Sequence, residues 1–486
     1  MKAIVIYDDT GSKSEVIADI IGDKGFADVV VNKRRLEDYY HDEIKKIFSD
    51  FVWKKVRSVF EYADIIKEME LYNEKDIRVL HCFSNYLISD SGKAALSFRK
   101  LPYIDTVFGV LDGRRAAAAM FPDLQGYVSF CKSIISGQHA WDLAKDFNEC
   151  FEIEGLVDIG VIENFIQCIT GNFDSRYFNC LKGSEYTLVK SSSNKKKIKA
   201  EYNFYHLLPE DMKFWFVMPF NYKEEENFAS YMMERFHMTD LAVKWVHGSM
   251  DETEFEDLMD KYFFFFKSRH ARECSENDYQ SKSKSLYVDK VKDRIAALKA
   301  LPEYKRIEAL LSVSGECNAD IDSLAAKYFS LKGKIEGRNE YPRQLVIGHG
   351  DPCFANALYN KSTKTLKFID PKGAVMEDEL WTNAYYDVAK LSHSVCGRYD
   401  FFNNALYNIE IDNDFSYHLE IPFDNAGYIK IFREKAAENG FDYMTVRIYE
   451  ASLFLSMLPL HIDNPHKVLG FILNVKNILE EIEKDV

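Results

Sequence analysis

The chain has 486 residues, of which 47% are hydrophobic and 29% are charged, and its formal net charge is −15. This length favours two domains, and the composition is that of a folded globular protein. The negative charge argues against a general binder of nucleic acids or anionic membranes, because both need clustered positive charge. Nine scattered cysteines without a Cys-x-x-Cys pair favour reduced thiols and a cytoplasmic protein. No apolar run approaches the roughly 18 residues that a membrane span needs.

Residues 1–172 are predicted to form a separate α/β domain. Strands are expected at residues 3–7, 29–31, 77–82 and 103–110. Alternation of strands and helices at this spacing predicts a partly parallel sheet. The run Gly11-Ser12-Lys13-Ser14 lacks the Gly-x4-Gly-Lys pattern of a phosphate loop and is interpreted as a helix N-terminus. Asp8 and Asp9 are neighbours on a strand and are not expected to share a metal ion, because they point to opposite faces.

Residues 151–160, which end in Asp158-Ile159-Gly160, resemble the closing segment of sugar nucleotidyltransferases, where such a triplet precedes a helix. The glycine-rich signature near the N-terminus of that family is absent here. The domain is therefore expected to be degenerate and nucleotidyltransferase-like, or to present a substrate. Asp158 and Glu163 are expected to be a strand-end acid and a helix-surface acid, not a metal pair.

From about residue 173 the pattern changes to short strands around one helix. Strands are expected at residues 177–181, 186–189, 215–218 and 228–233, and the helix at residues 195–208. Lys190 ends the second strand, and Glu201 lies in the middle of the helix. Residues 172–179 or 182–185 are the candidates for a loop that covers phosphates, although neither is glycine-rich.

Beyond residue 236 the pattern becomes helical. Residues 249–252 match the capping box of a helix N-terminus, and the aromatic residues that follow at helical spacing are typical of a core. Polar residues 268–285 are expected to form a loop. Helices are expected around Lys290 and at residues 445–458.

The most informative feature is His349-Gly350-Asp351, followed by Asn356 and then by Ile369-Asp370-Pro371. The segment between Asn356 and Asp370 is predicted to be a hairpin, which would bring these two residues close together. Phosphoryl transfer needs positioned metal ions, a cradle for phosphates and a carboxylate that accepts the proton of the attacking hydroxyl. One carboxylate and one amide oxygen suffice for Mg²⁺, because this ion keeps several waters and binds substrate phosphates.

These residues resemble the aminoglycoside phosphotransferase and choline kinase family, small-molecule kinases in which His-Gly-Asp stands in place of the protein kinases' His-Arg-Asp. The resemblance implies that residues 173–486 form an α+β, protein-kinase-like domain with a small lobe at 173–236 and a large helical lobe at 237–486. It implies ATP and Mg²⁺ as cofactors, with Asp351 as the catalytic base and Asn356 and Asp370 as metal ligands. The wider run also resembles a bacterial group in which such a kinase follows a nucleotidyltransferase-like domain, and that group is linked to capsule and surface-polysaccharide synthesis.

The same resemblance places the nucleotide. Lys190 would contact the α- and β-phosphates and be held by Glu201, as the strand lysine and helix glutamate of kinases are. Glu234 and Phe236 flank the expected hinge between the lobes, where backbone groups pair with the adenine edge. This placement follows from the order of the elements, since backbone contacts carry no side-chain signature.

Further positions follow from the family's plan. His349 and Asp387 are expected to support the catalytic loop. His461 and Asp463 are candidates for binding the acceptor, because this family recognises acceptors largely with C-terminal helices. A buried histidine and a loop acid without such a role fit the sequence equally well.

The sequence thus predicts a phosphotransferase that uses a nucleoside triphosphate to phosphorylate a hydroxyl of a small molecule, such as a sugar, polyol or amino alcohol. Two alternatives remain open. A pseudokinase scaffold would keep the fold and bind a partner, and a bifunctional enzyme would also activate the product as a nucleotide conjugate through the N-terminal domain. A protein kinase fits less well, because His-Gly-Asp replaces His-Arg-Asp. The sequence names neither the acceptor nor the oligomeric state.

Overall fold

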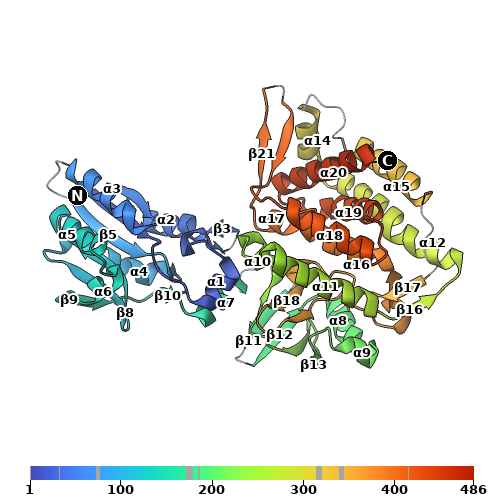
Figure 1. Cartoon of the computed structure of the whole chain (residues 1–486), viewed down its shortest axis with the longest axis horizontal. Helices are drawn as coiled ribbons and strands as arrows, with labels where there is room; N and C mark the ends of the chain where they lie inside the picture. Colours follow the sequence, from blue (N-terminus) through green and yellow to red (C-terminus); the bar gives the residue numbers. More distant parts are fainter. Residues whose placement is uncertain are drawn as a thin grey trace. The chain divides into compact units, whose positions relative to one another are not determined.

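Figure 1 shows the computed structural model of the chain. The structure describes residues 2–31, 33–72, 77–170, 179–183, 186–313, 320–338, 344–413 and 415–485. Contacts within it separate two compact units, Met1–Phe173 and Asp174–Val486. Each unit has a hydrophobic core of its own.

The first unit is built on a mixed sheet in the order β4-β1-β5-β8-β7-β9. β1 pairs in parallel with β4 and β5, whereas β8 is antiparallel to β5 and β7, so the prediction of a partly parallel α/β sheet is confirmed. β1 is buried along almost its whole length, as expected of a strand covered on both faces. The strands are β1 (Lys2–Asp8), β2 (Val30–Val31), β3 (Arg34–Arg35), β4 (Phe51–Val56), β5 (Ile77–Phe83), β6 (Tyr86–Ile88), β7 (Phe108–Asp112), β8 (Arg115–Phe121), β9 (Glu149–Glu152) and β10 (Leu156–Asp158). The helices are α1 (Glu15–Ile21), α2 (Leu36–Ile47), α3 (Tyr62–Glu70), α4 (Ser91–Phe98), α5 (Leu124–Ile135), α6 (Ala140–Lys145) and α7 (Ile162–Thr170).

The polar residues after β1 are bonded within the first unit. Ser14 caps α1, and its hydroxyl accepts a backbone N–H of the first turn, which confirms a helix N-terminus there. Asp8 lies 3.2 Å from His81, and both side chains are fully buried. Asp9 instead accepts the hydroxyl of Ser84 at 2.6 Å. The two adjacent acids therefore have separate partners.

Asp158 and Glu163 have different surroundings. The Asp158 carboxylate pairs with Arg115 at 2.5 Å and accepts the amide of Asn85 at 2.9 Å. Glu163 is exposed on α7. Asp158 is thus a strand-end acid held by its own unit.

The second unit begins with an antiparallel sheet in the order β11-β12-β14-β13, and α8 packs against it (Figure 1). This part comprises β11 (Asn179–Gly183), β12 (Thr187–Ser192), α8 (Lys195–Leu207), α9 (Glu210–Lys213), β13 (Pro219–Glu224), β14 (Ala229–Glu234) and β15 (Thr239–Asp240). Residues 171–178 and 184–185 lie outside the described residues, and they include most of the phosphate cover predicted at 172–179 and half of that predicted at 182–185. The strand predicted at 177–181 corresponds to β11, which is described from Asn179 onward.

The strand predicted at residues 215–218 is wrong, because β13 begins only at Pro219. The backbone of this apolar segment bonds to a different element. Val217 donates its N–H to the carbonyl of Phe368 at 3.2 Å, and the N–H of Phe368 donates to the carbonyl of Trp215 at 2.7 Å. The aromatic run therefore packs as an irregular segment against β19 (Thr365–Phe368).

The rest of the second unit is mainly helical, and α19 is buried on all sides, as expected of a central helix. The helices are α10 (Leu241–His247), α11 (Glu252–Ser268), α12 (Glu276–Lys284), α13 (Lys290–Ala300), α14 (Tyr304–Val313), α15 (Ile321–Glu336), α16 (Ala384–Val395), α17 (Tyr399–Asn403), α18 (Ala426–Glu438), α19 (Tyr443–Met457) and α20 (Pro465–Asp485). The strands are β16 (Ala271–Glu273), β17 (Gln344–Ile347), β18 (Ala357–Asn360), β19 (Thr365–Phe368), β20 (Trp381–Asn383), β21 (Asn408–Ile411) and β22 (Tyr417–Glu420).

Two predictions for this part are corrected. Residues 268–285 do not form a loop, since they contain β16 and α12. The N-cap of α11 is Asp251, whose carboxylate accepts the N–H of Glu254 at 2.7 Å, so the cap is not Ser249. In the first case a polar stretch forms regular structure that composition alone does not reveal, and in the second a nearby acid caps the helix instead of the predicted serine.

The predicted hairpin is confirmed. β18 and β19 pair antiparallel with Ala357 opposite Phe368. Beyond the last pair, the N–H of Ile369 donates to the carbonyl of Asn356 at 3.0 Å. The hairpin therefore brings the segments that carry Asn356 and Asp370 side by side.

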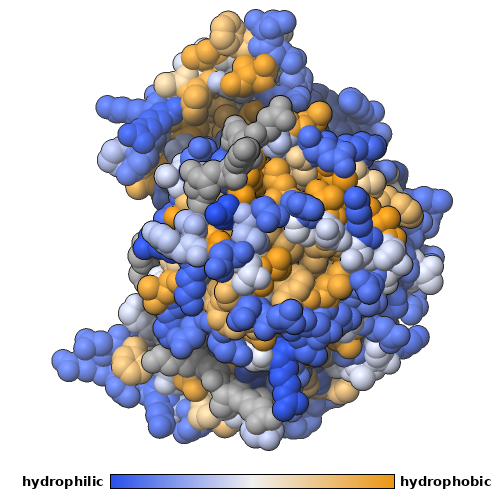
Figure 2. All heavy atoms as spheres, turned by 90° about the vertical axis from the view of Figure 1, so that its left-hand side faces the viewer, coloured by the Kyte–Doolittle hydropathy of each residue, from blue (hydrophilic) through white to orange (hydrophobic). Residues whose placement is uncertain are grey.

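The helices and the surface of the described residues are mostly amphipathic or polar. In the part of the chain that the structure describes, no helix combines the length and apolar character needed to cross a bilayer. On the face shown in Figure 2, hydrophilic side chains surround smaller groups of hydrophobic ones.

Candidate active site

The loop that carries Asp351 is fixed by a buried carboxylate. Asp387, on α16, accepts the backbone N–H groups of His349 at 2.9 Å and Gly350 at 2.8 Å. Arg269 pairs with the same carboxylate at 3.0 Å, and both side chains are buried. Gly350 has a φ of +84°, a conformation that glycine adopts without strain. Because buried N–H groups need partners, Asp387 holds the loop in this conformation.

His349 connects this loop to the strand that precedes Asp370. Its Nδ1 accepts the N–H of Asp351 at 3.0 Å, so the proton lies on Nε2, which donates to the carbonyl of Ile369 at 3.0 Å. Burial lowers the pKa of His349, which keeps the imidazole neutral, as this bonding pattern requires. His349 therefore fixes the backbone of Asp351 relative to that of Asp370.

Asn356 is hydrogen-bonded both to Asp351 and to the residue before Asp370. It closes the short turn η6 (Phe354–Asn356), and its Nδ2 donates to the backbone carbonyl of Asp351 at 2.9 Å. The backbone carbonyl of Asn356 accepts the N–H of Ile369, the residue before Asp370. The amide nitrogen is thus used within the protein, which leaves Oδ1 as the atom available to a ligand.

Two carboxylates converge on Lys190. Its Nζ lies 2.8 Å from Oε2 of Glu201 and 2.6 Å from Oδ1 of Asp370. Lys190 and Glu201 are buried, whereas 37% of the Asp370 side chain is exposed. Burial lowers the pKa of Lys190, but Asp370 and Glu201 outweigh this effect, and the pKa lies above its ordinary value. Lys190 is therefore a fixed cation that faces one partly exposed acid.

The backbone after Asp370 is shaped to meet α8. Asp370 has a φ of +55°, which is uncommon for a residue with a side chain. Gly373 has a φ of +87°, and an added Cβ would lie 2.7 Å from the backbone of Ala200. The N–H of Ala374 donates to the carbonyl of Ala200 at 3.0 Å. This contact positions Asp370 beside the helix that carries Glu201.

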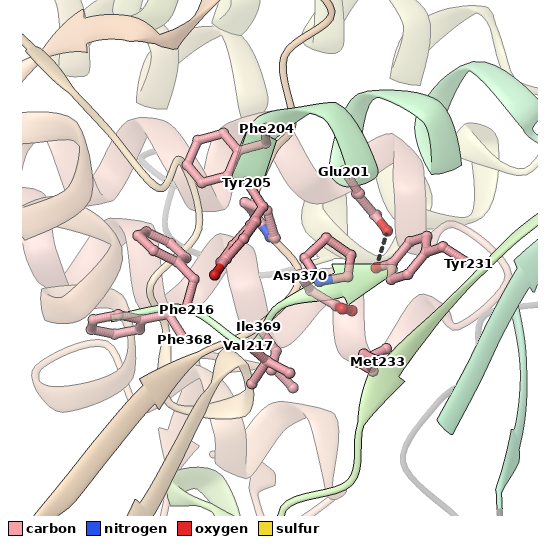
Figure 3. Close-up of a pocket in the computed structure, with 12 residues that line it drawn as sticks. Glu201, Phe204, Tyr205, Phe216, Val217, Tyr231, Met233, Phe368, Ile369 and Asp370 are labelled. Atoms are coloured by element: carbon pink, nitrogen blue, oxygen red, sulfur yellow. Dashed lines mark hydrogen bonds between the residues drawn. The ribbon is translucent and has the colours of Figure 1, made fainter. Parts of the chain in front are cut away.

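A small pocket lies beside these charges. Figure 3 shows Glu201 bonded to the hydroxyl of Tyr231, at 3.1 Å, near the Asp370 carboxylate. The rings of Phe204, Phe216 and Phe368 lie on the opposite side of the pocket. The polar groups of the site therefore border an apolar wall. The pocket is lined by Glu201, Phe204, Tyr205, Phe216, Val217, Pro219, Tyr231, Met233, Phe368, Ile369, Asp370 and Pro371.

Asp351 itself is paired with a lysine. Its Oδ1 lies 2.9 Å from Nζ of Lys390, and 40% of the Asp351 side chain is exposed. Burial raises the pKa of Asp351, but the Lys390 ammonium outweighs this effect, and the pKa lies below its ordinary value. The carboxylate is therefore ionised and accessible, which is the form that can accept a proton.

The residues predicted at the hinge lie at the end of β14. Glu234 is its last residue and is exposed. Phe236 packs against an apolar cluster that includes Tyr231 and Met233, and Leu188 and Ile369 pack against the same cluster. The N–H between them, that of Arg235, donates to the carbonyl of Tyr186 at 3.0 Å. Phe236 thus lies close to the elements that carry Lys190 and Asp370.

His461 and Asp463 differ in their surroundings. His461 ends the turn η8 (Leu458–His461) and meets the ring of Phe471 edge-on at 5.4 Å. Burial and the Lys390 ammonium hold the pKa of His393 well below its usual range, and His461 adds to this effect, so His461 lies within electrostatic reach of the helix beside Asp351. Asp463 is exposed in the turn before α20.

The sequence pattern does not predict Lys390, Arg269 or Tyr231 as site residues. Lys390 lies three residues after Asp387 on a helix, a spacing that places both on one face, so this signal was available. Arg269 is 118 positions from Asp387, and Tyr231 is 30 positions from Glu201. Such tertiary contacts leave no local pattern.

The donor atoms suit magnesium. The Asp370 carboxylate and the Asn356 Oδ1 are hard oxygen ligands of the kind that Mg²⁺ prefers. Among the described residues, no three His, Cys, Asp or Glu side chains form a group that could hold a metal ion. A metal held by Asp370 and Asn356 would therefore take its other ligands from phosphate and water.

Comparison with known proteins gives little further guidance. No family model and no curated protein matches the chain. Similar solved structures include aminoglycoside phosphotransferase APH(4)-Ia (12% identity, 66% of this chain and 97% of that chain, TM-score 0.34). Others are its thermostable mutants in ternary complexes with ADP and hygromycin B (11%, 65% and 97%, 0.35) and with AMP-PNP and hygromycin B (11%, 65% and 97%, 0.36). These TM-scores are too low to assign a shared fold.

Proposed function

We propose that residues 174–486 form an ATP- and Mg²⁺-dependent phosphotransferase that phosphorylates a hydroxyl group of a small molecule. The convergence of Glu201 and Asp370 on the buried Lys190 supports this proposal most strongly. Through His349 and Asn356, the same cluster is bonded to the segment of Asp351. A phosphate-binding cation, two metal ligands and a base thus lie in one connected site, as phosphoryl transfer requires.

Lys190 binds the phosphates in this proposal, and Glu201 keeps it in position. Asp370 and Asn356 hold Mg²⁺, which, when bound, would neutralise charge on the phosphate oxygens. The Lys190–Asp370 contact of 2.6 Å indicates that the ammonium and the metal would share one carboxylate. The third N–H of the Lys190 ammonium would then donate to the phosphates.

Asp351 orients the acceptor hydroxyl and takes its proton as the oxygen attacks the γ-phosphorus. The bond between that phosphorus and the bridging oxygen breaks, and ADP leaves. Lys390, 2.9 Å from Asp351, keeps the carboxylate ionised before the reaction. Asp387 and Arg269 hold the loop, so little reorganisation is needed at the moment of transfer.

A two-lobed arrangement is part of the proposal. The sheet and α8 at 173–236 would form the small lobe, and the helices at 237–486 the large one. Adenine would bind next to Glu234 and Phe236, where Phe236 offers an apolar side chain that packs against the same cluster as Ile369. His461 is a weaker candidate for acceptor binding, and Asp463 has the least support because it is exposed.

ATP turnover with pooled sugars, polyols, amino alcohols and hydroxy acids tests the proposal. Asp351→Asn should lower turnover by roughly 10²–10⁴ if Asp351 acts mainly as a general base. The affinity for ATP should stay the same, because Asp351 does not bind the nucleotide here. Wild-type turnover in this variant would show that Asp351 is not the base.

A pseudokinase scaffold is the main alternative. A scaffold has no need of an ionised, partly exposed acid held by a buried ion-pair network, and Asp351 has those properties.

For the first unit, we propose that it presents a substrate or is degenerate, since Asp8, Asp9 and Asp158 are bonded within it. Consumption of CTP or UTP with release of pyrophosphate would instead support a bifunctional enzyme. A cytoplasmic location and a role in capsule or surface-polysaccharide synthesis stay predictions from the sequence.

A further inference from the structure

Three lysines from separate segments gather around one buried tyrosine beside Asp351. Nζ of Lys290, on α13, donates to the hydroxyl of Tyr386 at 2.9 Å. Nζ of Lys372 lies 6.0 Å from the centre of the same ring. Tyr386 lies on α16, and Lys390 follows it one turn later on the same helix and pairs with Asp351. We call Lys290, Lys372 and Lys390 the lysine wall.

The lysine wall belongs to the base end of the site. Lys372 donates its N–H to the carbonyl of His349 at 2.9 Å. A Cβ added to Gly350 would lie 2.5 Å from the Cβ of Lys372, so Lys372 covers the loop that leads to Asp351. Lys290 comes from α13, which packs against α19 in the helical part. The sheet with Lys190 contributes none of the three lysines.

Positive charge in the lysine wall exceeds the negative charge that the protein supplies to it. Asp351 pairs with Lys390, but the described part of the chain gives neither Lys290 nor Lys372 a carboxylate partner. This excess stands out in a chain of net charge −15. Burial raises the pKa of Tyr386, yet Lys390, Lys290 and Lys372 outweigh that effect and the pKa lies below its ordinary value.

Neighbouring ammonium groups repel each other, and the repulsion is relieved when an anion binds among them. The phosphates of ATP are one possible anion, but Lys190 and the metal ligands already serve them in the proposed function. Lys290 and Lys372 are left for a second anion. That anion would lie next to Asp351, which is where the acceptor must bind.

We propose that the acceptor is an anionic alcohol, in which a phosphate or carboxylate group binds to Lys290 and Lys372 while the hydroxyl meets Asp351. This inference rests on the proposed phosphotransferase function and narrows its substrate class. Lys390 is a positioning residue that holds Asp351, and the Tyr386 hydroxyl fixes Lys290. Neutral and cationic alcohols would leave the two lysines without a counter-charge.

A panel of alcohols matched in carbon skeleton tests this. One series is glucose, glucosamine, glucuronate and glucose 6-phosphate, and the other is glycerol, 3-amino-1,2-propanediol, glycerate and glycerol 3-phosphate. ADP formation is measured with the full-length protein, ATP and Mg²⁺. The anionic members should have the higher kcat/KM in each series that is turned over, and the comparison of carboxylate with phosphate identifies the anion.

Charge-neutralising variants locate the anion. Lys290→Gln and Lys372→Gln should each raise the KM of the anionic acceptor by about tenfold to a hundredfold, the range expected for loss of a hydrogen bond to a charged group. The KM for ATP should not change. Lys292→Gln is the matched control, because Lys292 lies on the same helix, is exposed and stacks on Phe329 instead.

Several outcomes would overturn the inference. In the panel, preference for a neutral or cationic alcohol, or no turnover of any anionic member, would contradict it. In the Lys290 and Lys372 variants, an unchanged acceptor KM in both, or an increase in the KM for ATP instead, would do the same. Calorimetric binding of Mg²⁺·AMP-PNP separates these from failure of the phosphotransferase proposal. Binding without anionic preference refutes only the acceptor class, whereas absence of binding refutes both.

Discussion

One neighbouring charge, the Lys390 ammonium, determines how Asp351 can act. A carboxylate in a protein interior would ordinarily take up a proton more readily, because burial disfavours its charged form. Lys390 reverses this, and the pKa of Asp351 lies below its usual value. The partly exposed carboxylate therefore stays ionised over the neutral range, and its position is fixed by the backbone bonds to His349 and Asn356.

Replacing Lys390 should change the pH dependence of the reaction. Lys390→Met removes the cation that lowers the pKa of Asp351, so the carboxylate would ionise at higher pH. The acidic limb of kcat/KM should then move upward by about 1–3 pH units, the range for a close opposite charge. Rates are measured across pH with the wild type as reference. An acidic limb that does not move would mean that Asp351 is not the group that titrates.

Among the elements, β12 and α8 are joined through the Lys190–Glu201 pair. Removing one partner of a buried ion pair leaves an uncompensated charge, whereas replacing both partners with apolar side chains is often neutral. Lys190→Met should therefore destabilise the second unit by about 3 kcal/mol, at the lower end of the usual range, because Tyr231 still donates to Glu201.

The double variant Lys190→Met/Glu201→Leu should recover much of that stability in guanidinium unfolding but remain inactive. The stability cost and the functional role of Lys190 would thereby be separated. Recovery of turnover in the double variant would contradict a phosphate-binding role for Lys190.

Sequence patterns predicted those elements that carry a strong local signal of their own. The hairpin after Asn356 and the helix with Glu201 follow from local periodicity. The exposed polar helix α12 was missed because it has no apolar stripe, and residues 215–218 were misassigned because their partner, Phe368, is distant in sequence. The left-handed backbone of Asp370 also depends on tertiary contacts, here the docking of Gly373 on α8.

For the whole molecule, the separate cores of Met1–Phe173 and Asp174–Val486 predict two unfolding transitions, because each core can melt cooperatively. Mg²⁺·AMP-PNP should raise only the transition of the second unit. At a ligand concentration of a hundred times Kd, the expected stabilisation is about 2.7 kcal/mol. Scanning calorimetry measures both transitions. A shift in the first unit's transition would show that it binds the nucleotide too.

Calorimetric titration of AMP-PNP, with and without Mg²⁺, tests the central claim most directly. The variant for comparison is Asp370→Asn, since asparagine also tolerates the left-handed backbone at this position. The wild type should bind the nucleotide tightly only when Mg²⁺ is present, and Asp370→Asn should lose this dependence on the metal. Equal, Mg²⁺-dependent binding by both proteins would contradict a magnesium–triphosphate site formed by Lys190, Asn356 and Asp370.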